Sequence, residues 1–236
     1  MDVLVPNAVP AVDAAILTVV EGEVCVALAP GATDAAAGAW ALPGVLLRAD
    51  EGASDGLGRM VRDKLAGRYP GGFRPFGFSA EPRRDPRGRV VSLYHAGFLR
   101  RDEIAGFEAD TAYRLCPVRL GPDRAEARVA GRPVRLAYDH AEILRAALSW
   151  LRLQVPRGTV TRDLLGELFT LSALREVYEA VYGTRIAQPA FDYAVRAKGL
   201  AEPTPLRTGR APGGPGRPSV LHRPPSAPPQ HWEPLP

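Results

Sequence analysis

The chain has 236 residues, of which 46% are hydrophobic, and a formal net charge of +4. This length allows one large domain or two modest ones, and we expect two. No apolar run approaches the roughly 18 residues of a membrane helix, and no basic stretch precedes an apolar one at the start, so the sequence predicts a cytoplasmic protein with no membrane partner.

The first half of the chain has a β-strand pattern interrupted by one helix. Leu57, Val61 and Leu65 recur at i, i+4 and i+8, so we expect an amphipathic helix over residues 54–66. Strands on both sides of this helix predict a mixed α/β sandwich that ends near Ala137. Apolar runs bounded by turn residues predict these strands over residues 12–20, 24–29, 73–80, 90–99 and 113–120.

Residues 42–67 combine a glycine turn, an acidic residue and the predicted helix. Glu51 precedes Arg59 by eight positions. This order resembles a Nudix box, in which an Arg-Glu pair and then a Glu-Glu pair on one helix hold divalent cations on the diphosphate of a nucleotide. Here the residue after Arg59 is Met60, and the second acidic pair reads Asp63-Lys64.

The replaced carboxylates argue against hydrolysis. Magnesium and similar hard cations require oxygen ligands, which the thioether of Met60 and the ammonium of Lys64 do not supply. The positive charge of Lys64 would also repel a cation at that position. The glycine turn reads Gly44-Val45 where the family usually has two glycines, and a side chain limits the approach of phosphates to the backbone. We therefore expect no catalytic residue, no metal and no cofactor.

Positions in or near the motif also predict which residues line a ligand pocket. Arg48 is the best candidate for contact with a diphosphate, because a guanidinium can donate two hydrogen bonds to phosphate oxygens. Two alternatives stay open: Trp40 packs in the core instead of stacking on a base, and Glu51 forms only a structural ion pair with Arg59. The predicted ligand-binding residues are Trp40, Arg48, Glu51, Arg59 and Asp63.

The second half of the chain has helical character. A helix is expected to begin at an Asp139 cap, because apolar residues follow at helical spacing: Ala141, Leu144, Leu148 and Leu151. Three further helices are predicted over residues 164–169, over 171–182 between a Thr170 cap and a Gly183 stop, and over 189–198 from Pro189.

After these helices, residues 200–203 and 219–222 could pair as two short strands around a basic loop. Three helices, a strand, a basic loop and a strand are the order of a winged helix-turn-helix. A generic small helical domain with a Gly/Pro linker is the alternative.

Basic charge gathers near the end of the chain. Residues 184–236 carry seven basic and three acidic side chains, so their excess equals that of the whole chain. This distribution is typical of binding to a phosphate backbone, although a solvated basic tail has the same composition. In winged helices the last helix enters the major groove and wing arginines reach phosphates or the minor groove. The predicted DNA contacts are Gln188, Tyr193, Arg196, Lys198, Arg210 and Arg217.

The two halves together resemble the Nudix-related transcriptional regulators of the NrtR type, in which a Nudix-like sensor is fused to a winged helix. The resemblance implies an α/β fold class: a Nudix-like α/β/α sandwich over residues 1–137, a mostly α winged helix-turn-helix domain over 138–223, and a Pro-rich tail over 224–236. The matching stretches are residues 40–67, 138–144, 169–180 and 213–218.

The resemblance also implies a function. Regulators of this type are ligand-responsive repressors of NAD or related metabolic genes, commonly homodimers, which release double-stranded, palindromic operators when ADP-ribose or a similar metabolite binds. The helix from Asp139 would couple the domains, because a ligand changes DNA affinity only if it favours one dimer geometry. Two alternatives remain: a residual nucleotide-diphosphate hydrolase that uses Glu51 and Asp63, and an interaction protein that has lost both activities.

Overall fold

The computed structural model describes residues 8–121, 124–208 and 218–226. The described residues up to Thr18, together with Val24–Ser149, form one compact unit; Val19–Glu23 and the described residues from Trp150 onward form another. Helix α3 (His140–Gln154) contributes residues to both units. The domain boundary expected near Ala137 stays a prediction, because a division of the chain into compact units does not define functional domains.

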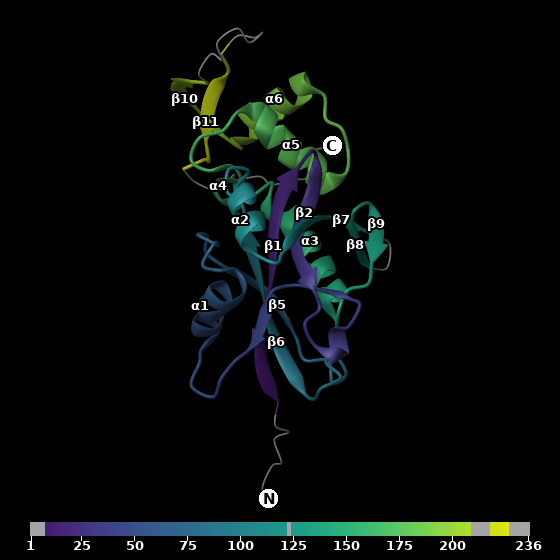
Figure 1. The fold of residues 1–236 in the computed structure, drawn as a ribbon. Helices are drawn as coiled ribbons and strands as arrows, with labels where there is room; N and C mark the ends of the chain where they lie inside the picture. Colours follow the sequence, from purple (N-terminus) through teal and green to yellow (C-terminus); the bar gives the residue numbers. More distant parts are fainter. Residues whose placement is uncertain (1–7, 122–123, 209–217, 227–236) are drawn as a thin grey trace, which may run out of the picture. The chain divides into compact units, whose positions relative to one another are not determined.

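The first unit is built on a mixed β-sheet (Figure 1). Its main order is β5-β6-β1-β2-β7-β8-β9, with β3 paired to β2 and β4 paired to β1. β1 runs parallel to β6, with Val9 opposite Val90, whereas β1 and β4 are antiparallel. The strands are β1 (Val9–Val20), β2 (Glu23–Pro30), β3 (Trp40–Ala41), β4 (Gly44–Leu46), β5 (Arg74–Ser79), β6 (Val90–Phe98), β7 (Arg114–Leu120), β8 (Ala125–Val129) and β9 (Arg132–Val134).

Helices lie on both sides of this sheet. In Figure 1, α1 (Ala53–Lys64) and α2 (Ile104–Asp110) lie on one side of β1, and α3 lies on the other. A short 3-10 helix, η1 (Asp34–Ala36), follows β2. Alternate residues of β1 share a buried cluster with α1 and α2, whose members include Val12, Ala14, Ile16, Leu57, Met60 and Phe107. The predicted α/β/α sandwich is confirmed.

The predicted strands and helix of this unit are found within a few residues of their expected ends. Sequence analysis missed α2 and the β8–β9 hairpin, in which Val129 pairs with Arg132. None of the helices in the described ranges is long and apolar enough to span a membrane.

The second unit has the element order expected of a winged helix. Helices α4 (Thr161–Leu165), α5 (Leu171–Tyr182) and α6 (Gln188–Lys198) precede the antiparallel pair β10 (Glu202–Arg207) and β11 (Val220–Arg223). The buried rings of Tyr178 and Phe191 meet edge to face at 5.3 Å, which fixes α5 against α6.

Local sequence signals set the ends of α5 and α6. Thr170 caps α5, since its Oγ1 accepts a hydrogen bond of 3.2 Å from the Ala173 amide. Gly183 and Gly199 end α5 and α6 in the left-handed conformation, at φ +69° and +65°.

The helix predicted over residues 164–169 was wrong in its extent. Gly166, at φ +82°, ends α4 after Leu165. Beyond it, Phe169 leaves the helical path and forms two backbone hydrogen bonds with His222, at 2.9 and 2.8 Å. Strand-like pairing therefore replaces the last turn of the predicted helix.

Candidate functional site

The loop before α1 is closed by an ion pair between Glu51 and Arg59. Arg59 donates from Nε to Oε1 and from Nη2 to Oε2 of Glu51, both at 2.7 Å, and the Arg48 amide donates to Oε2 at 2.9 Å. Arg59 Nη2 also donates to the Leu46 carbonyl at 2.8 Å. These hydrogen bonds, above all those from Arg59, lower the pKa of Glu51 to about 2. The carboxylate is therefore occupied in fixing this loop to α1.

The two motif positions that lack a carboxylate are occupied by Met60 and Lys64. Met60 is completely buried in the core between α1 and β1. Lys64, the last residue of α1, directs its ammonium to the carbonyl oxygen of Gly44 and donates to it. Burial of the ammonium lowers the pKa of Lys64; Asp13 opposes this shift, and Arg87 adds to it.

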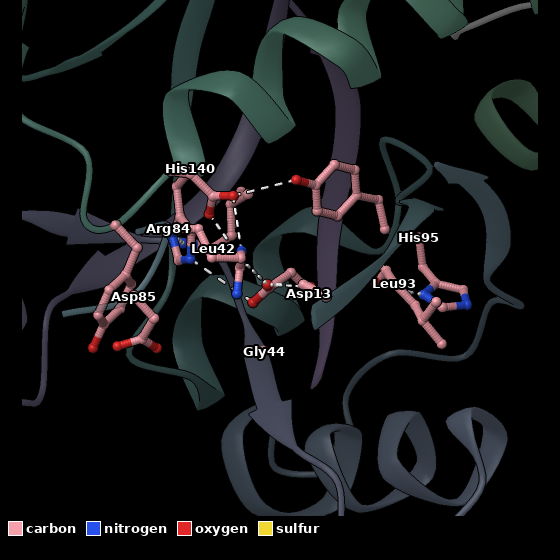
Figure 2. A network of polar contacts seen from close by, with 12 residues as sticks. Asp13, Leu42, Gly44, Arg84, Asp85, Leu93, His95 and His140 are labelled. Atoms are coloured by element: carbon pink, nitrogen blue, oxygen red, sulfur yellow. Dashed lines mark hydrogen bonds and ion pairs between the residues drawn. The ribbon is translucent and has the colours of Figure 1, made fainter. Parts of the chain in front are cut away.

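A buried polar network centred on Arg84 lies in the same unit (Figure 2). The Arg84 side chain is 3% exposed, and it donates to Asp139 at 2.7 and 2.8 Å and to Asp13 at 3.0 Å. The Ser92 hydroxyl donates to the same oxygen of Asp13 at 2.6 Å. Burial opposes the charge of Arg84, but the two carboxylates outweigh it and raise the pKa of the guanidinium. The network ties β1, the loop before β6 and the start of α3 together.

His140 and Gly44 complete the surroundings of Asp13. The Leu42 amide donates to His140 Nδ1 at 2.9 Å, and His140 Nε2 lies 3.8 Å from Asp13 Oδ1. Burial lowers the pKa of His140, so the ring is neutral and its Nε2–H faces the carboxylate. A Cβ atom at Gly44 would lie 2.0 Å from Asp13 Oδ1, so only glycine fits there. Figure 2 shows Leu42, Arg84 and His140 near Asp13, with His95 apart beside Leu93.

A cavity of about 350 Å³ opens beside this network. Its volume lies within the usual range for small-molecule pockets. Three of its cations are paired with carboxylates: Arg59 with Glu51, Arg84 with Asp13 and Asp139, and Arg87 with Asp85. Among the described residues, no carboxylate lies within ion-pair distance of Lys64. The charged and aromatic lining consists of Asp13, Arg59, Lys64, Arg84, Asp85, Arg87, Tyr138 and His140.

One wall of the cavity combines an arginine with an aromatic ring. The Arg87 guanidinium lies 4.9 Å from the ring centroid of Tyr138, and it donates to Asp85 at 2.6 and 2.9 Å. The Tyr138 hydroxyl is 2.7 Å from Thr33 Oγ1. Stacking and hydrogen bonding thus hold a cation and a ring at the edge of the cavity.

The structure brings only part of the predicted ligand set to this cavity. Arg59 lines it, whereas Trp40, Arg48, Glu51 and Asp63 are not among its lining residues. The role of these residues in ligand binding stays a prediction.

Lys64 was considered only as a lost metal ligand. The other charged and aromatic lining residues that sequence analysis missed are Asp13, Arg84, Asp85, Arg87, Tyr138 and His140. Asp13 had a usable signal, because it is an acidic residue inside an apolar strand. The two arginines lie in a turn-rich segment whose spatial neighbours the sequence does not specify.

The donor set does not suit a divalent cation. Within the described ranges, no group of three or more His, Cys, Asp or Glu side chains is placed to hold a metal ion. At the motif positions, Glu51 is bound by Arg59, and Lys64 supplies a positive charge. Hard cations need several oxygen ligands, so these residues do not fit magnesium.

Helix α6 presents a second candidate site. Gln188, Tyr193 and Arg196 are exposed, with Tyr193 at 70%, and Lys198 is half-buried. Phe191 and Val195 are buried, as predicted. The predicted wing contacts Arg210 and Arg217 lie outside the described residues. The contacts of all six residues with DNA stay predictions.

Known proteins with similar sequences also have a winged helix at this position. Residues 161–223 match the family model of the NrtR DNA-binding winged helix domain. Residues 161–223 therefore resemble the DNA-binding winged helix of NrtR-type proteins. The chain is also 26% identical over 204 residues to the ADPR responsive transcriptional repressor NtrR of Acinetobacter baylyi, a match that spans 84% of this chain and 76% of that protein.

Solved structures resemble this fold over nearly the whole chain. NrtR of Shewanella oneidensis, in complex with a 27mer DNA, superposes with a TM-score of 0.69 at 23% identity, over 91% of this chain and 92% of that one. A MutT/nudix family protein from Enterococcus faecalis gives a TM-score of 0.70 at 20% identity, over 92% and 88%. The resemblance to NrtR-type proteins, with a Nudix-like domain before the NrtR-type winged helix, is confirmed.

Proposed function

We propose that this chain is a ligand-responsive DNA-binding transcriptional repressor. The observation that carries the proposal is the combination, in one chain, of an NrtR-type winged helix and a Nudix-like domain with a cation-lined cavity. The Acinetobacter baylyi relative, an ADPR responsive transcriptional repressor, supports the same function. Genes of NAD or related metabolism are the expected targets.

The cavity of the first unit is the effector site in this proposal. Arginine and lysine side chains recognise phosphate groups, and the ring of Tyr138 offers a surface for a base or sugar. ADP-ribose or a similar nucleotide diphosphate has both chemical parts. The domain acts as a sensor and not as a hydrolase, because Met60 is a core residue and Lys64 is a cation where the motif has carboxylates.

The winged helix is the DNA-binding part. Exposed polar and basic residues of α6 would read the major groove, with Gln188 suited to adenine and Arg196 to a phosphate. A homodimer would place two such helices on the half-sites of a palindromic operator. Helix α3 would couple the effector site to the DNA-binding part, because it begins at the cavity residue His140 and its last residues belong to the second unit.

Fluorescence anisotropy tests this function. The full chain is titrated onto DNA from upstream of its own gene and its neighbours, with and without ADP-ribose, and onto an unrelated duplex. Specific binding that ADP-ribose relieves is the expected result. Specific binding unaffected by ADP-ribose would require another effector, and equal binding to all duplexes would refute the repressor. Turnover of ADP-ribose with magnesium or manganese would instead establish a hydrolase.

A further inference from the structure

Lys64 differs from the arginines of the effector cavity in its pairing. Its ammonium lies on the Gly44 carbonyl oxygen, at a motif position where a Nudix box has a carboxylate. The described residues place no carboxylate within ion-pair distance of it, in contrast to Arg59, Arg84 and Arg87. A neutral carbonyl satisfies one donor of the ammonium but does not cancel its charge. This leaves one positive charge in the cavity without a direct counterion.

The other cations of the cavity are paired with carboxylates, and Arg84 and Arg59 are also largely enclosed. Arg84 is 3% exposed and shared by Asp13 and Asp139. Arg59 is 15% exposed and bound through two donors to Glu51. Arg87 is 43% exposed, and its pair with Asp85 uses Nε and Nη2 and leaves Nη1 for another acceptor. Lys64, which has no carboxylate partner among the described residues, and Arg87, which keeps a donor, are therefore the two cations available to an anion in the cavity.

We propose that Lys64 binds the diphosphate of the effector directly, so that recognition needs no divalent cation. The inference rests on the proposed effector function of the cavity. The ammonium neutralises one phosphate charge and donates hydrogen bonds to phosphate oxygens, as a metal ion would through coordination. The preferred ligands are nucleoside or sugar diphosphates, and a neutral nucleoside binds much more weakly.

Isothermal titration calorimetry on the full chain tests the proposal, with ADP-ribose, ADP and inorganic pyrophosphate as probes. Each titration is made in magnesium and in EDTA at equal ionic strength. The expected dissociation constants agree within about threefold between the two conditions. An affinity for ADP-ribose that EDTA abolishes would overturn the proposal, as would the absence of binding by all three probes.

Three variants at one position give the sharper test. Lys64→Met removes the charge and should weaken ADP-ribose binding about 10- to 100-fold, the range expected for a lost charge-assisted hydrogen bond. Lys64→Arg keeps the charge and should retain most of the affinity. Lys64→Glu should abolish binding in EDTA. Unchanged affinity in Lys64→Met would refute the role of the ammonium.

Arg62→Met is the matched control. Arg62 lies on α1, is exposed and does not line the cavity, so its loss removes the same charge from the same helix. Its affinity for ADP-ribose should stay within twofold of the unmodified chain, and an equal loss in both variants would refute a specific contact. Thermal unfolding monitored by circular dichroism checks that each variant is folded.

The DNA assay separates this inference from the proposed function. Lys64→Met should bind operator DNA normally and fail to release it at ADP-ribose concentrations that release the unmodified chain. If the unmodified chain binds no operator, the repressor proposal fails, while calorimetry still decides whether Lys64 binds the diphosphate without metal.

Discussion

The cations of the cavity and those of α6 are held in different ways. Arg59 and Arg84 are enclosed and each is bonded to carboxylates at 3.0 Å or less, whereas Arg196 projects from α6 as an exposed side chain. Paired, enclosed charges hold the wall of the cavity in one geometry, while exposed charges can adjust to a flexible phosphate backbone. Substitution of Arg59 or Arg84 should therefore lower stability, and substitutions on α6 should affect DNA binding alone.

The largest effect is expected from Arg84→Met. The variant leaves the carboxylates of Asp13 and Asp139 enclosed without their cation, and breaking a buried ion pair in this way costs about 3–5 kcal/mol. Urea denaturation measures the loss, and hydrogen exchange of peptides from β1 and β6 assigns it to the first unit. Arg83→Met, one residue earlier and exposed, should change stability by less than about 0.5 kcal/mol. Equal effects of the two variants would contradict a structural role for the network.

Arg196→Ala tests the exposed side of the comparison. Loss of one phosphate contact should weaken DNA binding about five- to tenfold and reduce the slope of affinity against salt by about one, with unchanged stability. Anisotropy titrations at several salt concentrations measure both quantities. Arg128→Ala removes the same charge from an exposed position of β8 and should leave both unchanged. A salt slope unaffected by Arg196→Ala would remove this residue from the interface.

Thr170→Ala should have a smaller effect, confined to the winged helix. The Thr170 hydroxyl accepts from the Ala173 amide, and loss of such a cap costs about 1 kcal/mol. Hydrogen exchange of α5 should increase, while exchange in β1 and β6 stays the same. Thr170→Ser keeps the oxygen and is the control. Faster hydrogen exchange of α5 in both variants would show that the effect comes from packing of the threonine methyl group and not from the cap.

Sequence predicted the fold well where local signals determine structure. Thr170, Gly183 and Gly199 fix the ends of helices within one or two residues, so α5 and α6 could be placed from the sequence. Phe169 was misplaced because its pairing with His222 is a long-range contact that overrides local helical character. The β8–β9 hairpin was missed because β9 has only three residues and carries little strand pattern.

The site was less predictable than the fold. The Nudix motif led to Arg59, which lines the cavity. It also led to Glu51, and the two hydrogen bonds from Arg59 agree with the alternative that Glu51 forms a structural ion pair. Arg84 could be recognised only from the three-dimensional structure, because its partners Asp13 and Asp139 are distant in sequence. Parallel pairing of β1 and β6 brings Asp13 near the loop that carries Arg84. A buried network of this kind depends on topology, and no short motif encodes it.

The smallest effect is expected from Glu51→Gln, and it appears as a change in pH dependence. The folded-state pKa of Glu51 is lowered from 4.5 to about 2, so its contribution to stability is present above pH 4.5 and is lost as the pH falls toward 2. Urea denaturation at several pH values should give a flatter curve for Glu51→Gln in this window. For the control Glu126→Gln, at an exposed position of β8, the curve of stability against pH should be parallel to that of the unmodified chain.

The same variant distinguishes the two roles of Glu51. If the carboxylate only holds Arg59 and the loop before α1, Glu51→Gln should reduce stability and leave the affinity for ADP-ribose within about threefold, since Lys64 and Arg87 remain in place. Calorimetry measures that affinity at neutral pH. A much larger loss of affinity, without a change in the pH dependence of stability, would make Glu51 a ligand contact and place the effector closer to the Nudix loop than the cavity suggests.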